Sequence, residues 1–136
     1  ISSEVRVEAF IEDMAAAYAW ADIVICRSGA LTIAELAVVG VSSILVPYPY
    51  ATDDHQTGNA RFLADAGAAI LLPQTELSAA RLAGLIADFS GQRNMLLEMA
   101  CRAHELAMPD AARRVAAHCL RAAGIHTDAL SAGSTS

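Results

Sequence analysis

Short apolar runs alternate with longer helical patterns along the first half of the chain. Four of these runs are typical of strands, and the last three are almost continuously apolar, as expected for strands that are covered on both faces. The predicted strands are residues 5–9, 23–26, 43–46 and 69–72. The helical patterns between them cover residues 12–20, 30–39 and 57–66, and the last two end before Gly40 and Gly67. Glycine at this place commonly ends a helix in a left-handed conformation.

This alternation predicts the class of fold. Strands that alternate with helices of this length imply right-handed βαβ crossovers, and therefore an α/β protein with an incomplete Rossmann-like parallel sheet and flanking helices. Four strands are fewer than the roughly six of a complete doubly wound sheet, so we expect further strands upstream of Ile1. After Pro73 the pattern is helical only, with helices expected after the Ser78 cap, over about residues 92–107 and from Pro109.

Composition narrows the possible functions. The 136 residues allow one domain, predicted over residues 1–123, and the small polar residues 124–136 predict a disordered tail. Hydrophobic residues make up 55% of the chain, yet no apolar run reaches the ~18–20 residues of a transmembrane helix. A net charge of −6 argues against nucleic acid as a partner and against an electrostatic membrane anchor here. Three cysteines without paired spacing indicate a reducing, cytoplasmic compartment.

The most informative stretch leads from the second predicted strand into the following helix. The strand ends at residues 27–29, and the helix is predicted to begin at about Ala30. The first amides of a helix have no internal partner and the helix dipole adds positive charge, so this turn is a candidate anion site. Ser28 and Gly29 have too little side chain to keep a phosphate away. Glu35, further along the helix, can accept hydrogen bonds from sugar hydroxyls, which suggests a nucleotide or sugar nucleotide.

A purely structural interpretation of the same residues remains open. Thr32 and Glu35 also fit a capping box, in which the two side chains only satisfy backbone groups at the helix start. Strand–turn–helix units occur in every α/β protein, and Ser-Gly is ordinary turn chemistry. Spacing alone therefore does not decide between a ligand site and a helix cap.

The ends of two other predicted strands carry further candidates. Ile11, at the rim after the first strand, is a candidate to contact a flat base, whereas Phe10 and Met14 are expected in the core. The loop over residues 47–56 is long for a connection between a strand and a helix, and such loops often carry function.

His55 and Gln56 are expected in the first turn of the next helix, facing the same crevice as the turn at Ser28. Asp53 or Asp54 is expected to cap that helix. A glutamine amide offers both a donor and an acceptor to sugar hydroxyls. A solvent-facing position remains open for His55, and packing remains open for Asn59.

Other chemistry finds little support in the sequence. Cys26 has no identifiable histidine partner, which favours burial over a nucleophilic role, and Cys101-x-x-His104 lacks a second pair of zinc ligands. No Ser-His-Asp arrangement or pair of acidic catalysts is found, and the glycines match neither a P-loop nor a dinucleotide fingerprint. We therefore expect no catalytic residue, no metal and no cofactor in this chain.

Together these residues resemble the C-terminal half of the MurG family, bacterial glycosyltransferases of peptidoglycan synthesis. The likeness runs from about Val7 to Leu120. It is carried by Phe10-Ile-Glu-Asp-Met14, Ala17-Tyr-Ala-Trp-Ala-Asp22, the highly specific Cys26-Arg-Ser-Gly-Ala-Leu-Thr32 with Glu35, Asp54-His-Gln56 with Asn59-Ala60, and Pro109-Asp110. The family's GT-B fold has two Rossmann-like halves around a cleft, and the C-terminal half holds the donor.

The resemblance implies a function. The family moves N-acetylglucosamine from UDP-N-acetylglucosamine to undecaprenyl-pyrophosphoryl-N-acetylmuramoyl-pentapeptide (lipid I), with inversion, and so makes lipid II. It works as a peripheral protein at the cytoplasmic face of the bacterial inner membrane. Helix-terminus electrostatics would stabilise the leaving UDP, with no metal required in this half.

The resemblance also implies roles for single residues. Ile11 would contact uracil through its backbone, Glu35 would bind the ribose hydroxyls, and Gln56 would bind hydroxyls of N-acetylglucosamine. The diphosphate would be lined by the start of the helix, namely Ala30, Leu31 and Thr32, with Ile33 and Ala34 continuing that segment.

The chain departs from the family pattern in what precedes these motifs. The family's Gly-Gly-Ser loop and an upstream arginine are absent, as is the N-terminal half with its acceptor site, candidate base and membrane-contacting patch. We therefore expect this chain alone to transfer no sugar, and lipid I and the membrane to be reached through the other half. Two alternatives remain: a stand-alone sugar-nucleotide-binding subunit of a split transferase with a separate membrane partner, and an epimerase of the same fold, whose paired glycines and glutamates the turn lacks.

Overall fold

A computed structural model describes residues 4–107 and residue 124. Within this part of the chain, three parallel strands form one sheet in the order β1-β2-β3. The strands are β1 (Ile23–Cys26), β2 (Ser42–Leu45) and β3 (Ala69–Leu71). Ile23 pairs with Ser42 and Ser43 pairs with Ala69, so the three strands begin at the same end of the sheet. The predicted α/β class with a parallel sheet is confirmed.

Helices connect the strands and cover them. In the described ranges they are α1 (Met14–Trp20), α2 (Ala30–Val39), α3 (His55–Ala64), α4 (Ala79–Ser90) and α5 (Arg93–Glu105), with two 3-10 turns, η1 (Thr52–Asp54) and η2 (Gln74–Glu76). The bounds of α2 are as predicted, those of α1, α3 and α5 differ from prediction by at most two residues at either end, and α4 begins directly after Ser78 as predicted. The helix expected from Pro109 and the tail expected over residues 124–136 lie outside the described residues, Gly124 excepted. None of the described helices has the length and apolar character that crossing a membrane requires.

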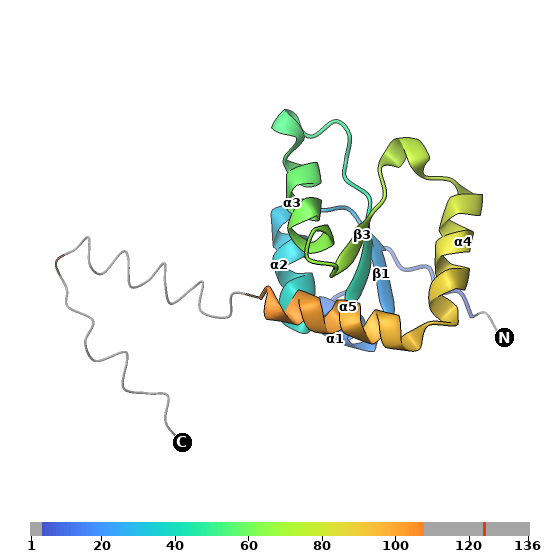
Figure 1. Cartoon of the computed structure of the whole chain (residues 1–136). Coiled ribbons are helices and arrows are strands. Elements are labelled where there is room, and N and C mark those ends of the chain that lie inside the picture. The colour runs from blue at the N-terminus through green and yellow to red at the C-terminus, as the bar shows by residue number, and fades with distance from the viewer. Residues whose placement is uncertain (1–3, 108–123, 125–136) are drawn as a thin grey trace, which may run out of the picture.

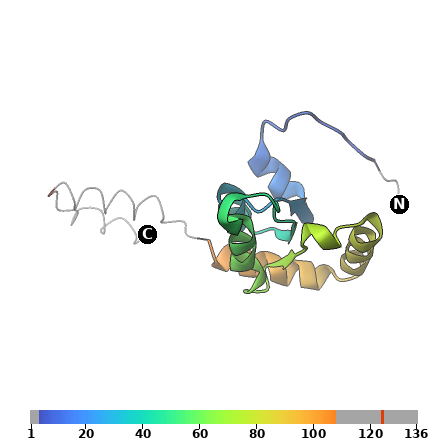
Figure 2. The ribbon, with the colours of Figure 1, turned by 90° about the horizontal axis from the view of Figure 1, so that it is seen from above.

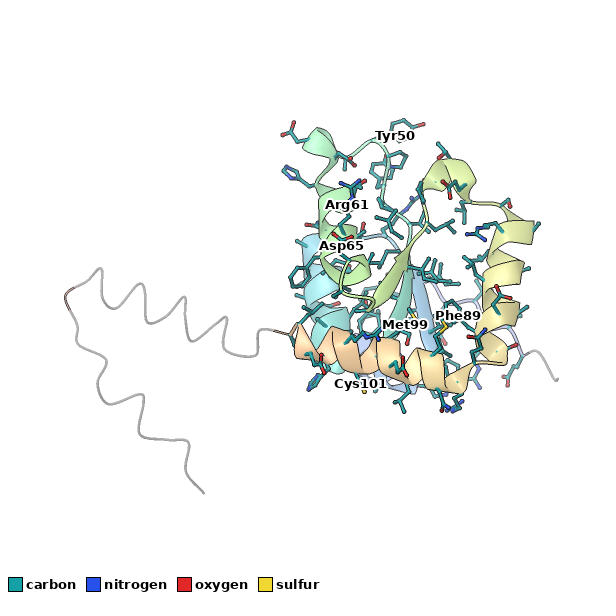
Figure 3. The ribbon with its side chains drawn as sticks, in the orientation of Figure 1. Tyr50, Arg61, Asp65, Phe89, Met99 and Cys101 are labelled. Atoms are coloured by element: carbon teal, nitrogen blue, oxygen red, sulfur yellow. The ribbon has the colours of Figure 1, made fainter. Side chains whose placement is uncertain are left out.

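The sheet is the middle layer of the molecule, with α1 on one side and α5 on the other (Figure 2). All four residues of β2 are buried because helices cover both faces of this strand. Leu45 packs with Leu36 of α2 in one cluster, and Ile44 packs with residues of α4 and α5 in the other. Figure 3 shows Phe89 and Met99 of this second cluster close together between α4 and α5. Cover on both faces explains why residues 44–46 are apolar and why Ser42 and Ser43 are buried beside them.

The connections that follow the strands gather at one edge of the sheet. Residues 27–29 lead from β1 into α2, β2 leads through η1 into α3, and β3 leads through η2 into α4. The two longer connections rise together at the top of Figure 1. In open parallel sheets the carboxyl ends of the strands form the crevice where ligands bind. The topology therefore places the candidate residues of these connections at the expected edge.

The prediction of a strand over residues 5–9 is wrong. The described chain before α1 contains neither helix nor strand, and Figure 2 shows it as an arc outside the helices. Val5 and Val7 are 80% and 92% exposed, and Phe10, which was expected in the core, is 79% exposed. A strand is stable when its backbone groups form hydrogen bonds with an adjacent strand and one of its faces packs against other residues. Nothing among residues 4–107 pairs with the free edge of β1, so the alternating pattern has no partner.

Gly40 ends α2 in the left-handed conformation, as predicted, with φ 72°. A Cβ at this position would lie 3.0 Å from the Cβ of His104 and 3.3 Å from the carbonyl oxygen of Ala100, both in α5. Gly67 has the same φ, but α3 ends three residues earlier, at Ala64. Gly40 therefore both ends α2 and allows the close approach of α5.

Gly40→Ala is expected to lower the free energy of unfolding by about 1–3 kcal/mol, because the left-handed backbone and the close contact with α5 both disfavour a methyl group. Urea denaturation measures this change. Gly58→Ala is the matched control, since Gly58 lies inside α3 and a Cβ there meets nothing within 4 Å. The control should keep or raise stability, by up to about 1 kcal/mol. Equal denaturation midpoints for the two variants would contradict this account.

Candidate functional site

The amino end of α2 lies directly after β1 and has no side-chain cap. Gly29 is the N-cap residue, with φ −61° and ψ 150°. The first helical bond joins the amide of Ile33 to the carbonyl oxygen of Gly29 over 3.0 Å. Within residues 4–107, no protein oxygen accepts a hydrogen bond from the amides of Ala30, Leu31 or Thr32. These three N–H groups are oriented as the donors of an anion site at a helix start.

The capping-box interpretation of Thr32 and Glu35 is wrong. The helix begins at Ala30 with Gly29 as its N-cap, so Thr32 is already the third helical residue. A capping box requires the threonine to be the N-cap residue itself. The side chain of Glu35 is therefore not engaged at the helix start.

Glu35 lies half-buried at a hollow of about 290 Å³ between α1 and α2. The hollow is lined by Met14, Ala15, Tyr18, Ala34, Glu35, Val38 and Val39. The hydroxyl of Tyr18 donates a hydrogen bond to Oε2 of Glu35 over 3.4 Å. Burial and the neighbouring Glu35 raise the pKa of Tyr18, which keeps this hydroxyl a donor at neutral pH. A carboxylate has further acceptor positions, so Glu35 can still accept from a ligand hydroxyl. Met14, expected in the core, is 39% exposed at this hollow.

Ser28 connects the turn before α2 to the start of α3. Its side chain is fully buried, and its Oγ donates to the carbonyl oxygen of Gln56 over 2.7 Å. The Ser28 amide donates to Oε1 of Gln56 over 3.3 Å, and Nδ2 of Asn59 donates to the Ser28 carbonyl oxygen over 3.0 Å. The structure thus brings Ser28, Gln56 and Asn59 together. It gives Ser28 and Asn59 partners inside the protein.

The side chain of Gln56 bonds to the connections that follow both β1 and β2. Its Oε1 also accepts a hydrogen bond from the amide of Tyr48 over 2.8 Å. No acceptor for its side-chain NH₂ group is found among the described residues, so this end of the amide can serve a ligand. Asp54 is the N-cap residue of α3, but its side chain does not bond to a helix amide, contrary to prediction. Its Oδ1 accepts from the hydroxyl of Thr57 over 2.6 Å instead.

The other candidates take no part in these hydrogen bonds. Ile11 is 41% exposed in the segment before α1. His55 is exposed, with Nε2 3.9 Å from Oδ2 of Asp53. Ile33 is 5% exposed, so only its backbone could reach a ligand, whereas Ala34 lines the hollow beside Glu35.

Arg27 was not among the residues predicted for the site. Its Nη1 donates to the carbonyl oxygens of Val46 and Pro47, each over 3.3 Å, and to Oε1 of Gln74 over 2.7 Å. Its guanidinium also lies 5.5 Å from the ring centroid of Tyr48. One side chain therefore links the connections that follow all three strands. An arginine placed directly after a predicted strand, at the edge where these connections meet, was the available signal.

Cys26 is half-buried at the end of β1, as the sequence predicted. Burial raises the pKa of its thiol to about 11, so the thiol is protonated at neutral pH and is a poor nucleophile.

Within the described ranges, no three His, Cys, Asp or Glu side chains come together as a set that could hold a metal ion.

A parallel sheet with flanking helices and an open helix start at the carboxyl end of a strand defines a Rossmann-like class of α/β domain. Residues 2–115 match the model of the glycosyltransferase family 28 C-terminal domain. The chain belongs to this family.

The chain is similar to curated UDP-N-acetylglucosamine--N-acetylmuramyl-(pentapeptide) pyrophosphoryl-undecaprenol N-acetylglucosamine transferases. It is 64% identical to the enzyme of Dechloromonas aromatica over 110 residues, which are 81% of this chain and 30% of the relative. It is 55% identical to the enzyme of Shewanella sediminis over 120 residues, 88% of this chain and 33% of the relative. The chain thus spans about a third of the length of these relatives.

A solved structure agrees with this assignment. The crystal structure of Acinetobacter baumannii MurG matches with a TM-score of 0.80 and 46% sequence identity, over 85% of this chain and 33% of that chain. The resemblance to the MurG family and the fold, that of a GT-B C-terminal domain, are confirmed.

Proposed function

We propose that the chain is the donor-binding half of an inverting N-acetylglucosaminyltransferase of peptidoglycan synthesis. Its donor is UDP-N-acetylglucosamine, and the acceptor is lipid I, which becomes lipid II. Family membership and the names of the relatives support this proposal. The observation that carries it is the uncapped start of α2 at the carboxyl edge of the sheet, with Glu35 one turn further along the same helix.

In this proposal the donor lies along the start of α2. The diphosphate accepts hydrogen bonds from the amides of Ala30, Leu31 and Thr32, which have no acceptor among residues 4–107. Glu35 binds the ribose hydroxyls from the wall of its hollow, beside Ala34. The backbone of Ile11, in the exposed segment before α1, reads the edge of the uracil.

The sugar of the donor lies toward α3. Gln56 offers its side-chain NH₂ group to the hydroxyls of N-acetylglucosamine, because its Oε1 already accepts from two backbone amides. Exposed His55 adds a second polar group at the same helix start. Ser28 and Asn59 contribute by holding the turn, since their hydrogen bonds are made within the protein.

The chemistry follows from where charge develops. In the transfer, a hydroxyl of lipid I forms the new bond to the anomeric carbon and loses its proton to a base. The bond between that carbon and the β-phosphate oxygen breaks, and its electron pair leaves with UDP. Amides and a helix dipole aimed at the diphosphate stabilise that charge without reorganising. The acceptor, a base and the contact with the cytoplasmic face of the membrane belong to the two-thirds of the relatives that this chain does not match.

Calorimetric titration of the 136-residue chain tests the proposal. UDP and UDP-N-acetylglucosamine are expected to bind with saturation, and ADP to bind more weakly because the purine presents a different edge to the backbone of Ile11. The proposal would be contradicted if neither UDP nor UDP-N-acetylglucosamine bound with saturation, or if ADP and UDP bound with equal affinity. The chain alone is expected to form no lipid II from donor and lipid I.

A further inference from the structure

We propose that Arg27 and Gln74 act as a pair of positioning residues for the donor site, an inference that rests on the proposed function. The two side chains come from the connections after β1 and β3, which lie on opposite sides of β2 in the sheet. The pair fixes the connections at the strand ends relative to one another, so that the first turn of α2 and Gln56 present their donors in one arrangement.

The contact between the two side chains is the shortest that Arg27 makes. Nη1 of Arg27 lies 2.7 Å from Oε1 of Gln74, compared with 3.3 Å from each of the carbonyl oxygens of Val46 and Pro47. Hydrogen bonds from a charged donor are stronger than those between neutral groups. Since Arg27 directly precedes Ser28 in the chain, these bonds also restrain the backbone of the turn before α2.

The contacts form a closed circuit around the candidate site. Pro47 accepts from Arg27, and the next residue, Tyr48, lies under the guanidinium and donates its amide to Gln56. Gln56 in turn accepts from the amide of Ser28, the neighbour of Arg27. Groups in such a network strengthen one another, so loss of one link is felt by the others. Gln74 attaches the connection after β3 to this circuit.

A substitution at Gln74 distinguishes a positioning role of Arg27 from direct binding of the donor by Arg27. It begins η2, and neither the site geometry nor the family resemblance gives it a donor contact. An effect of Gln74 on UDP affinity must therefore pass through Arg27. If Arg27 instead binds the diphosphate by itself, removal of the Gln74 side chain should have no effect on UDP binding.

A double-mutant cycle in the 136-residue chain tests the pair, with UDP affinity measured by NMR titration. Arg27→Lys keeps the charge but loses the planar fork of donors, and Gln74→Ala removes the acceptor. Each single variant is expected to weaken UDP binding by about three- to tenfold, and the double variant to bind no more weakly than Arg27→Lys alone. Arg81→Lys and Thr75→Ala, at exposed positions in α4 and η2, are the matched controls and should bind UDP like the wild type.

The proposal would be overturned if Gln74→Ala bound UDP as tightly as the wild type. It would also be overturned if the losses of UDP affinity in the two single variants multiplied in the double variant. The amide chemical shifts of Ala30, Leu31 and Thr32 in the free protein give a second measure. They are expected to change in Gln74→Ala and not in Thr75→Ala, a difference that general loss of stability would not produce. Failure of the proposed function looks different: the wild-type chain itself would not bind UDP, and the free-protein shifts would still test the pair.

Discussion

Ala30→Pro is expected to weaken UDP binding by about ten- to a hundredfold, the range for loss of a hydrogen bond to a charged group. Proline removes the amide of Ala30, the first of the three donors at the start of α2. The fold should persist, because the first helical position has no intrahelical bond to lose and its φ suits proline. Gly29 already has the extended conformation, φ −61° and ψ 150°, that a residue before proline adopts.

Ala79→Pro is the matched control for this substitution. Ala79 is the first residue of α4, and Ser78 before it has the extended φ −144° and ψ 160°. The control should bind UDP like the wild type, and both proline variants should unfold at similar urea concentrations. If Ala30→Pro binds UDP as tightly as Ala79→Pro does, the diphosphate does not lie at the start of α2.

Glu35→Ala is expected to weaken UDP binding by about five- to thirtyfold, because the half-buried carboxylate accepts hydrogen bonds from the ribose hydroxyls. The measurement compares UDP with 2′,3′-dideoxy-UDP in the wild type and in the variant. The wild type should prefer UDP, and the variant should bind the two nucleotides with similar affinity. Loss of discrimination, and not only loss of affinity, is the expected result.

Tyr18→Phe provides the control for Glu35. This variant keeps the carboxylate and the packing of the ring but removes the hydroxyl that donates to Oε2 over 3.4 Å. A long hydrogen bond contributes little, so the loss of UDP affinity should be smaller than in Glu35→Ala. Unchanged discrimination between the two nucleotides in Glu35→Ala would remove Glu35 from the ribose site.

The parts of the fold that could be predicted are those that local pattern determines. The bounds of α2 follow from small residues before it and Gly40 after it, and both act within a few positions along the chain. The strands β1 and β2 were recognised from short runs rich in apolar residues, although β1 is only partly covered, with Ile25 40% exposed, and β2 begins with two serines. The open start of α2 could be anticipated because no residue that caps a helix with its side chain stands directly before Ala30. That this helix start binds an anion stays a prediction.

The predictions that were wrong or incomplete depend on contacts with residues that are distant in the chain, which the sequence pattern does not specify. Residues 5–9 have the alternation of a strand, but no described residue supplies a ladder beside β1, and Phe10 consequently stays exposed. Ser28 was expected to matter for its small size at the ligand, whereas its hydroxyl is used by the backbone of Gln56. The hydrogen bond between Arg27 and Gln74 joins residues far apart along the chain, which approach because the connections after β1 and β3 meet at one edge of the sheet.

NMR of the backbone amides of the 136-residue chain, recorded during titration with UDP, tests directly whether the diphosphate lies at the start of α2. The amides of Ala30, Leu31 and Thr32 are expected to shift most and to saturate together, because they donate to the diphosphate. Saturable binding of UDP that leaves these three amides unchanged would contradict the central claim that the start of α2 is the phosphate site.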